Sequence, residues 1–170
     1  SLQGISEDFT RFVDSLIYAS AYCSNQPVSE IRTNQKTNIR DDGVDTEVRW
    51  KTDIAWLDWF DVPTCWQYKA TSKRNIDGSK LKKELKKDYV KGLIRQGYGY
   101  RFCICDSLPA TVKETWESIL CKEISRINDK APKPKVITAD DLSHWVNHFP
   151  ALIVRFFKSR LKETLHIDAW

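Results

Sequence analysis

Residues 41–50 read DDGVDTEVRW, an acidic turn followed at once by alternating apolar and charged residues. Aspartate and glycine favour tight turns, so Asp42 and Gly43 alone predict nothing more than a turn. The residues from 44 to 54 then alternate as in a half-buried β-strand, where successive side chains point to opposite faces. We therefore predict a turn that leads directly into a strand.

A second strand is predicted at Thr64–Thr71, TCWQYKAT. Two strands joined by a short connection pair antiparallel, which places Asp45 across from Lys69 or within a residue or two of it. Gln67 and Lys69 lie on the same face of their strand because side chains alternate. A carboxylate, an amide oxygen and an ammonium group are therefore expected to converge at one edge of the sheet.

The rest of the chain alternates amphipathic helical segments with short apolar runs. The predicted elements, in chain order, are a helix at 5–22, a short strand near 30–33, the two strands described above, a helix at 79–96, a strand at 100–107, a helix at 110–128 and, after the linker DKAPKPKVIT, helices beginning ADDLSHW and PALIVRFFKSRLKETL. This order predicts an α/β (α+β) fold with a central mixed sheet flanked by helices. We expect a core at residues 1–130 and a helical extension at 131–170 packed on it, forming a single domain.

The bulk composition is that of an ordinary globular domain, with 170 residues, 41% hydrophobic content and a net charge of +4. No apolar run approaches the roughly 20 residues that cross a bilayer, so no membrane association is expected. The five cysteines lack zinc-ribbon spacing, and we expect reduced thiols in a cytoplasmic protein. The segment from Lys73 to Arg95 contains nine basic and three acidic residues. Its local charge of +6 favours a polyanionic partner.

The converging polar residues suit a hard divalent cation, because Mg²⁺ takes oxygen ligands and typically one or two from protein. Asp45, the side-chain oxygen of Gln67 and the backbone carbonyl of Tyr68 are the candidate ligands for Mg²⁺ (or Mn²⁺). Such an ion polarises a phosphodiester and lowers the pKa of an attacking water. Lys69 then orients that water or neutralises charge that develops on the phosphate. Further candidate acids for the metal site are Glu7, Glu30, Asp42 and Glu47.

D-G-V-D, a strand, a turn and a strand carrying Q-Y-K resemble the PD-(D/E)xK nuclease superfamily, in particular its Mrr-like restriction endonuclease branch. The resemblance covers residues 5–106 and implies a restriction-endonuclease-like core. By position, Asp45 matches the metal-binding aspartate, Gln67 the residue that is usually Asp or Glu, and Lys69 the catalytic lysine. Asp42 matches an acid common before the glycine. The chain departs from the pattern on its first helix, where the family often carries a glutamate.

The resemblance implies a Mg²⁺-dependent DNA endonuclease, a hydrolase of phosphodiester bonds in DNA that is expected to be double-stranded. The chain has no methionine and begins with Ser1, and it resembles an N-terminal nuclease effector of a bacterial antiphage protein such as a STAND-type NTPase. The alternative is a catalytically weak nuclease-fold module that binds nucleic acid or mediates assembly, because Gln67 weakens the metal site by one charge. Candidate DNA contacts are Lys73 and Arg74, which directly follow the second strand and are the favoured phosphate contacts, and Lys80, Lys83 and Lys87, whose helix equally fits a solvated surface.

Activity on both strands of a duplex needs two copies of one site, so we expect a homo-oligomer in the active state. The C-terminal helices carry the candidate contact surface, which we predict to be exposed. Its residues are Trp145, Phe149, Phe156 and Phe157. The alternative is that these side chains cover the sheet.

Overall fold

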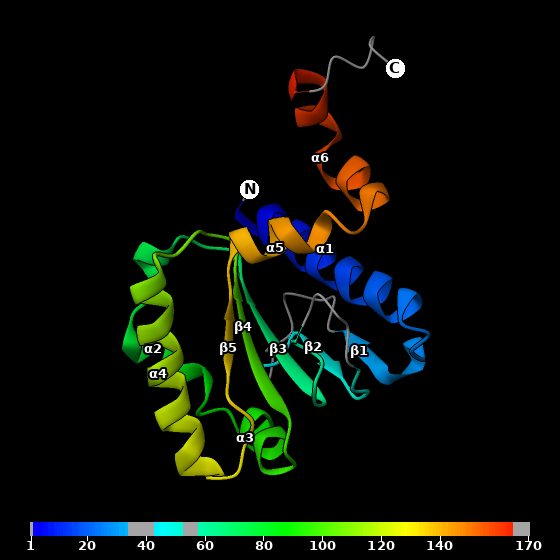
Figure 1. The fold of residues 1–170 in the computed structure, drawn as a ribbon. Coiled ribbons are helices and arrows are strands. Elements are labelled where there is room, and N and C mark those ends of the chain that lie inside the picture. Colours follow the sequence, from blue (N-terminus) through cyan, green and yellow to red (C-terminus); the bar gives the residue numbers. More distant parts are fainter. Residues whose placement is uncertain (1, 34–42, 53–57, 165–170) are drawn as a thin grey trace.

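The computed structural model describes residues 2–33, 43–52 and 58–164. Its centre is a five-stranded sheet in the order β1-β2-β3-β4-β5, with β1–β2 and β2–β3 antiparallel and β3–β4 and β4–β5 parallel. The predicted mixed sheet is therefore confirmed (Figure 1). The strands are β1 (Ile31–Thr33), β2 (Thr46–Val48), β3 (Thr64–Lys69), β4 (Gly99–Ile104) and β5 (Lys135–Ile137).

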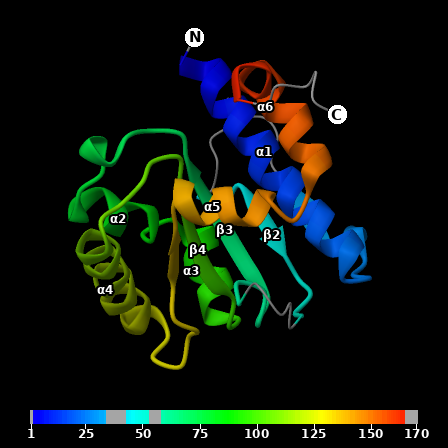
Figure 2. The same ribbon diagram turned by 45° about the horizontal axis from the view of Figure 1, so that its top comes forward.

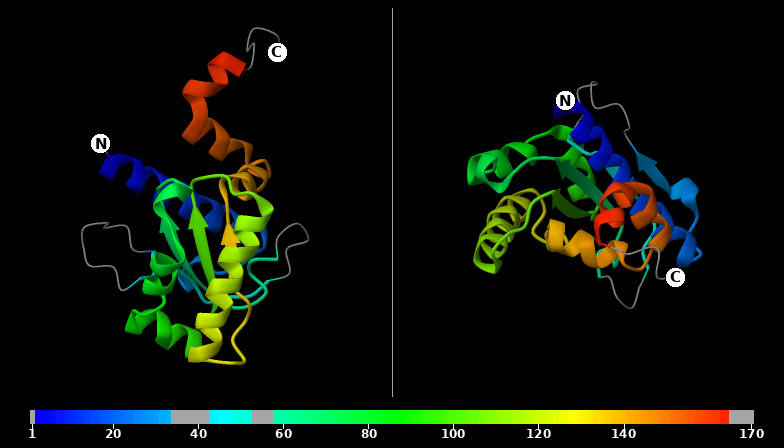
Figure 3. Two further views of the ribbon diagram at one scale, coloured as in Figure 1. Left: turned by 90° about the vertical axis from the view of Figure 1, so that its left-hand side faces the viewer. Right: turned by 90° about the horizontal axis from the view of Figure 1, so that it is seen from above.

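Within the described part of the chain, six α-helices flank this sheet. They are α1 (Leu2–Cys23), α2 (Gly78–Glu84), α3 (Asp88–Arg95), α4 (Ala110–Ile127), α5 (Ala139–Val146) and α6 (Pro150–Thr164). Helices α2 and α4 lie on one side of the sheet and α1 on the other (Figures 1 and 3). This layout agrees with the predicted α/β fold of restriction-endonuclease type. Among the described helices, none has the length and apolarity that crossing a membrane requires.

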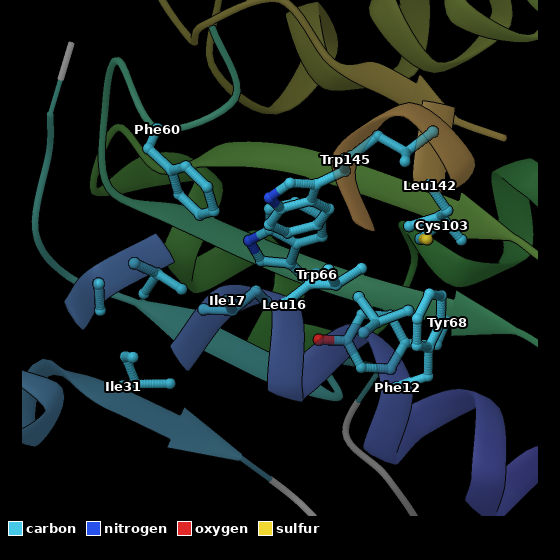
Figure 4. Packing of buried hydrophobic residues seen from close by; sticks show 14 of the residues in the cluster. Phe12, Leu16, Ile17, Ile31, Phe60, Trp66, Tyr68, Cys103, Leu142 and Trp145 are labelled. Carbon is cyan, nitrogen blue, oxygen red and sulfur yellow. The ribbon is translucent and has the colours of Figure 1, made fainter. Parts of the chain in front are cut away.

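The face of the sheet toward α1 is covered by aromatic and branched side chains. Trp66 of β3 stacks on Trp145 of α5 with ring centroids 6.0 Å apart, and the Trp145 indole N–H donates to Ser20 Oγ at 3.0 Å (Figure 4). Because strand side chains alternate, Trp66 and Tyr68 both point to this side. The residues between and after them, Gln67 and Lys69, therefore point to the opposite face.

The opposite face packs against α2, α3 and α4. Cys65, Tyr100 and Phe102 supply the sheet side of this second core, and Leu81 and Leu120 are among the buried helix residues. The alternation that buries Cys65 carries Gln67 and Lys69 out along the same face toward the C-terminal end of β3. On the neighbouring strand β4 the core continues beside them, through Phe102 and Ile104.

The helix predicted over 79–96 is in fact two helices, α2 and α3. The backbone leaves the helical region at Lys87, which is extended with φ −67° and ψ 133°. Near the break, Leu85 and Val90 are buried, whereas Tyr89 is 42% exposed. No glycine or proline marks the break, so the spacing of apolar residues suggested one continuous helix.

Two strand predictions also needed correction. Strand β2 covers only Thr46–Val48, much shorter than the predicted 44–54. The linker predicted at 129–138 contains β5, whose Val136 and Ile137 are buried against the sheet. The segment after residue 130 therefore adds a strand to the sheet as well as helices, and the division at that residue stays a prediction.

The C-terminal aromatic residues are not the exposed surface that the sequence suggested. Trp145 and Phe149 are buried, with 1% and 9% exposure. Phe156 and Phe157 of α6 contact Phe12 of α1 edge-on, with ring centroids 5.3 and 5.4 Å apart. Helix α6 thereby lies beside α1 (Figure 2). The alternative therefore holds for Trp145, which covers Trp66 of the sheet, whereas Phe156 and Phe157 pack on α1.

Candidate active site

The candidate site lies where β2 begins and β3 ends. Thr46 is paired with Trp66, so the preceding Asp45 lies across from Gln67. The Asp45 N–H donates to the carbonyl of Trp66 at 2.8 Å, which extends the ladder by one step beyond β2. Asp45 therefore lies opposite Gln67, two residues before Lys69 on β3. This agrees with the prediction that Asp45 lies within a residue or two of the position opposite Lys69.

The carboxylate of Asp45 is fixed to β3 by two hydrogen bonds. Its Oδ2 accepts from Gln67 Nε2 at 2.8 Å and from the Tyr68 backbone N–H at 2.6 Å. In an antiparallel ladder the N–H and C=O of one residue point to the same side. The Tyr68 carbonyl therefore points toward the same edge as Asp45. Asp45 is thus in direct contact with the amide nitrogen of Gln67, and the Tyr68 carbonyl faces the same edge of β3.

The residues present fit a magnesium ion. The Oε1 atom of Gln67 is buried and has no hydrogen-bond partner among the described residues. Leaving such an acceptor unpaired costs roughly 1–3 kcal/mol, which a cation or a water beside it would recover. In the described residues, no three acids, histidines or cysteines gather into a metal cluster. Among the described residues, Asp45 and Gln67 offer one carboxylate and one amide oxygen, a set that suits an ion completed by water and substrate.

Lys69 lies on the same face, but its ammonium contacts an acid that sequence reasoning missed. Lys69 Nζ is 2.7 Å from Glu84 Oε1 at the C-terminal end of α2, and Lys87 Nζ is 3.0 Å from Glu84 Oε2. Burial opposes ionisation of Glu84, but the hydrogen bonds and charges of Lys69 and Lys87 outweigh it and lower the pKa of that carboxyl. Glu84 is therefore an ionised bridge between two lysines.

Position 43, in the D-G-V-D motif, requires a glycine because of its backbone conformation and because of the side chains packed against it. Gly43 has φ +86°, a conformation that side-chain-bearing residues rarely adopt. A Cβ atom at Gly43 would lie 2.4 Å from Lys87 Cδ and 2.8 Å from Val90 Cγ2. The loop that delivers Asp45 thus passes directly against the aliphatic stem of Lys87. Asp42, the candidate acid just before this glycine, lies outside the described residues.

A second missed acid, Asp14 of α1, lies behind the site on the other face of the sheet. Its Oδ1 accepts from Thr46 Oγ1 at 2.6 Å and from Tyr68 Oη at 2.8 Å. Burial raises the pKa of Asp14 to about 6, although the two hydroxyl hydrogen bonds act in the opposite direction. A signal existed in the sequence, since an acid beside the apolar stripe of the first helix needs buried partners.

The candidate metal-site acid Glu47 is already paired. Its carboxylate accepts from Tyr89 Oη at 2.6 Å, from Arg49 Nε at 3.1 Å and from Tyr98 Oη at 3.3 Å. Burial opposes its ionisation, but the Tyr89 and Arg49 hydrogen bonds outweigh it and lower the pKa of Glu47. Glu47 lies two residues along β2 from Asp45, and its partners are side chains rather than the Asp45–Gln67 pair.

The other two candidate acids lie in different places. The carbonyl of Glu30 accepts from Arg49 N–H at 3.0 Å, which places Glu30 at the far end of β2 from Asp45. Glu7 is on the first turns of α1, where Phe9 packs edge-on against Tyr68 at 6.3 Å. Glu7 therefore lies near the end of the sheet that carries Gln67 and Lys69, but its helix covers the face of the sheet opposite to these two side chains.

The predicted DNA contacts divide into two groups. Lys73 Nζ donates to the Ser107 carbonyl at 3.2 Å and Lys80 Nζ to the Asn75 carbonyl at 2.6 Å, so both fasten the loop after β3. Lys87 is paired with Glu84, as described above. The remaining two, Arg74 and Lys83, are exposed.

Comparison of the chain with protein-family models, with curated proteins and with solved structures found no match. Inference about function therefore depends on the residues of the site and on their geometry.

Proposed function

We propose that the chain is a metal-dependent DNA endonuclease. The observation that carries this proposal is the direct contact between Asp45 and Gln67 at the end of two paired strands, with Lys69 next on the same face. A carboxylate, an amide oxygen and an ammonium group in this arrangement suit hydrolysis of a phosphodiester. The local charge of +6 between Lys73 and Arg95 favours a polyanionic substrate, which we take to be double-stranded DNA.

Each residue has a distinct task in this proposal. Asp45, Gln67 Oε1 and the Tyr68 carbonyl hold Mg²⁺ or Mn²⁺, which when bound polarises the phosphodiester and makes water a better nucleophile. The hydrogen bonds from Gln67 and Tyr68 keep the Asp45 carboxylate in one orientation. Lys69 supplies a positive charge close to this group and stabilises the charge that grows on the phosphate.

Single substitutions in the site test the proposal on supercoiled plasmid with Mg²⁺. Asp45→Asn and Lys69→Met should each lower the cleavage rate by roughly 100-fold or more, as loss of a group acting on developing charge does. The matched control is Lys113→Met, because Lys113 forms a half-buried ion pair with Asp141 elsewhere on the molecule. Circular dichroism verifies that each variant is folded. Cleavage by either site variant at the parental rate would contradict the assignment.

A second candidate function is a nuclease-fold module that binds nucleic acid with little or no catalysis. Gln67 in place of a carboxylate favours it, as does the existing ion pair between Lys69 and Glu84. Calorimetry with Mg²⁺ and Mn²⁺ separates the two functions. A nuclease should bind the ion and lose that binding in Asp45→Asn, whereas a binding module should retain DNA affinity with no ion bound.

The cellular setting is part of the same proposal. A nuclease of this kind suits the effector domain of a bacterial antiviral protein, held in the cytoplasm and activated by assembly. Two copies are needed to cut both strands at one place, so two domains joined by a linker should cut duplex DNA faster per domain than separate domains do. Equal rates per domain would remove the reason for proposing assembly.

A further inference from the structure

Glu84 connects four segments that surround the candidate site. It is the last residue of α2 and contacts Lys69 at the end of β3 and Lys87 at the start of α3. The stem of Lys87 in turn packs against Gly43, in the loop that leads to Asp45. The Glu84 carboxylate therefore lies between Lys69 at the end of β3 and Lys87 at the start of α3. Through the stem of Lys87 it is also connected to the loop that leads to Asp45.

A lysine side chain needs such a partner to hold one position. It has four flexible methylene groups, and the entropy of its many rotamers is lost when it is fixed. The Lys69–Glu84 pair is short, at 2.7 Å, and the two side chains are only 25% and 16% exposed. Because solvent screens a half-buried pair less than a surface pair, the contact is strong enough to select one rotamer of Lys69.

We propose that Glu84 is a positioning residue for Lys69. This inference depends on the proposed nuclease function, because a defined position of Lys69 matters most if that lysine acts on the phosphate. Glu84 acts on the site through Lys69, whose ammonium it contacts. Its removal should leave the fold and the metal-binding oxygens in place and should let the Lys69 ammonium move.

A second bridging acid, on the neighbouring helix α4, provides the control. Glu123 of α4 lies 3.8 Å from Lys82 of α2 and 2.6 Å from Arg126. Its side chain is 19% exposed, close to the 16% of Glu84, and it also bridges two basic residues. The partners of Glu123 are more exposed than those of Glu84, and none of them is Lys69. Glu123→Gln therefore measures the general cost of losing a bridging carboxylate on this surface.

The experiment compares Glu84→Gln, Glu84→Asp and Glu123→Gln with the parent by steady-state cleavage of a defined DNA duplex. Misplacing a catalytic group by about 1 Å can cost up to 100-fold in rate, so kcat of Glu84→Gln should fall by roughly 10- to 100-fold with KM within about twofold. Glu84→Asp retains the charge with a shorter reach and should recover part of the loss. Glu123→Gln should leave both constants within about twofold of the parental values.

A measurement independent of cleavage keeps the two proposals distinguishable. The Lys69 ammonium should give a resolved ¹H–¹⁵N correlation in the parent, because its ion pair slows exchange with water, and this signal should vanish in Glu84→Gln and persist in Glu123→Gln. Lys69→Met assigns the signal. If the parent binds no Mg²⁺ and cuts no DNA, the nuclease proposal fails, while the spectra still decide whether Glu84 holds Lys69. An unchanged Lys69 signal or an unchanged kcat in Glu84→Gln overturns the positioning role.

Discussion

The buried carboxyl of Asp14 should make the stability of this protein depend on pH in a way that one substitution removes. Its pKa is raised from the ordinary value of 3.8 to about 6 by burial between α1 and the sheet. Between these values the folded protein binds more protons than the unfolded chain does. Stability therefore falls as the pH rises through this range, and the favourable contribution present below pH 3.8 is lost above pH 6.

The size of the effect follows from the shift. The difference of about 2.2 units, from 3.8 to about 6, corresponds to about 3 kcal/mol at 1.36 kcal/mol per unit, and most of it has developed by pH 7. At pH 5 the Asp14 carboxyl of the unfolded chain is already largely ionised, so part of this loss of stability is present at that pH. The linkage relation leaves about 1.4 kcal/mol that develops between pH 5 and pH 8.

Asp14→Asn should abolish this dependence and keep the contacts. An asparagine Oδ1 accepts from Thr46 and Tyr68 as the carboxylate oxygen does, and its amide nitrogen replaces Oδ2, which has no hydrogen-bond partner among the described residues. The unpaired amide N–H groups cost roughly 1–3 kcal/mol, but they do not titrate, so this offset is the same at every pH. Relative to the parent, the variant should gain about 1.4 kcal/mol between pH 5 and pH 8.

Urea unfolding followed by tryptophan fluorescence at pH 5, 6, 7 and 8 measures the difference by linear extrapolation. Other titrating groups are common to both proteins and cancel in the comparison. Asp8→Asn, which removes an exposed carboxylate from the same helix, is the control and should differ from the parent by a constant amount. A stability difference for Asp14→Asn that stays constant or shrinks as the pH rises would refute the reasoning.

Three further predictions, two of them with a matched control substitution, test the surroundings of the site. Gly43→Ala should lower the free energy of unfolding by about 2–4 kcal/mol, because its positive φ and close contacts leave no room for a Cβ. The control is Gly92→Ala in α3, which has open space around it and should raise the free energy of unfolding by about 0.5–1 kcal/mol. Glu47→Gln should cost about 1–2 kcal/mol of stability in urea unfolding and leave cleavage within about twofold. Lys87→Met should leave the salt dependence of DNA binding unchanged in filter binding, while Lys83→Met should reduce the slope by about one.

The convergence of Asp45 with Gln67 followed from the sequence because it depends on short-range rules. Side-chain alternation fixes which residues share a face, and a hairpin of known length limits the register to a residue or two. The observed contact between Asp45 and Gln67 confirms that reasoning. Their function as metal ligands stays a prediction.

Features that depend on distant partners were not predictable in the same way. Glu84 is one acid among many lysines on a helix, and such a residue usually faces solvent. Its contact with Lys69 depends on the break after α2, which no glycine or proline marks. Strand β5 has only three residues, too few for periodicity to distinguish it from the linker around it.

The two missed acids lie on opposite faces of the sheet: Asp14 contacts Thr46 of β2 and Tyr68 of β3, and Glu84 contacts Lys69 of β3. Thr46 follows Asp45, and Tyr68 lies between Gln67 and Lys69, so alternation turns both hydroxyls toward Asp14 on α1. The site residues themselves face the α2 side, where an ionised Glu84 holds the lysine. Asp14 thus sets the positions of the strand backbones, and Glu84 sets the position of one side chain. Substitutions on the α1 face should therefore act on the site as a whole, whereas substitutions on the α2 side act through Lys69.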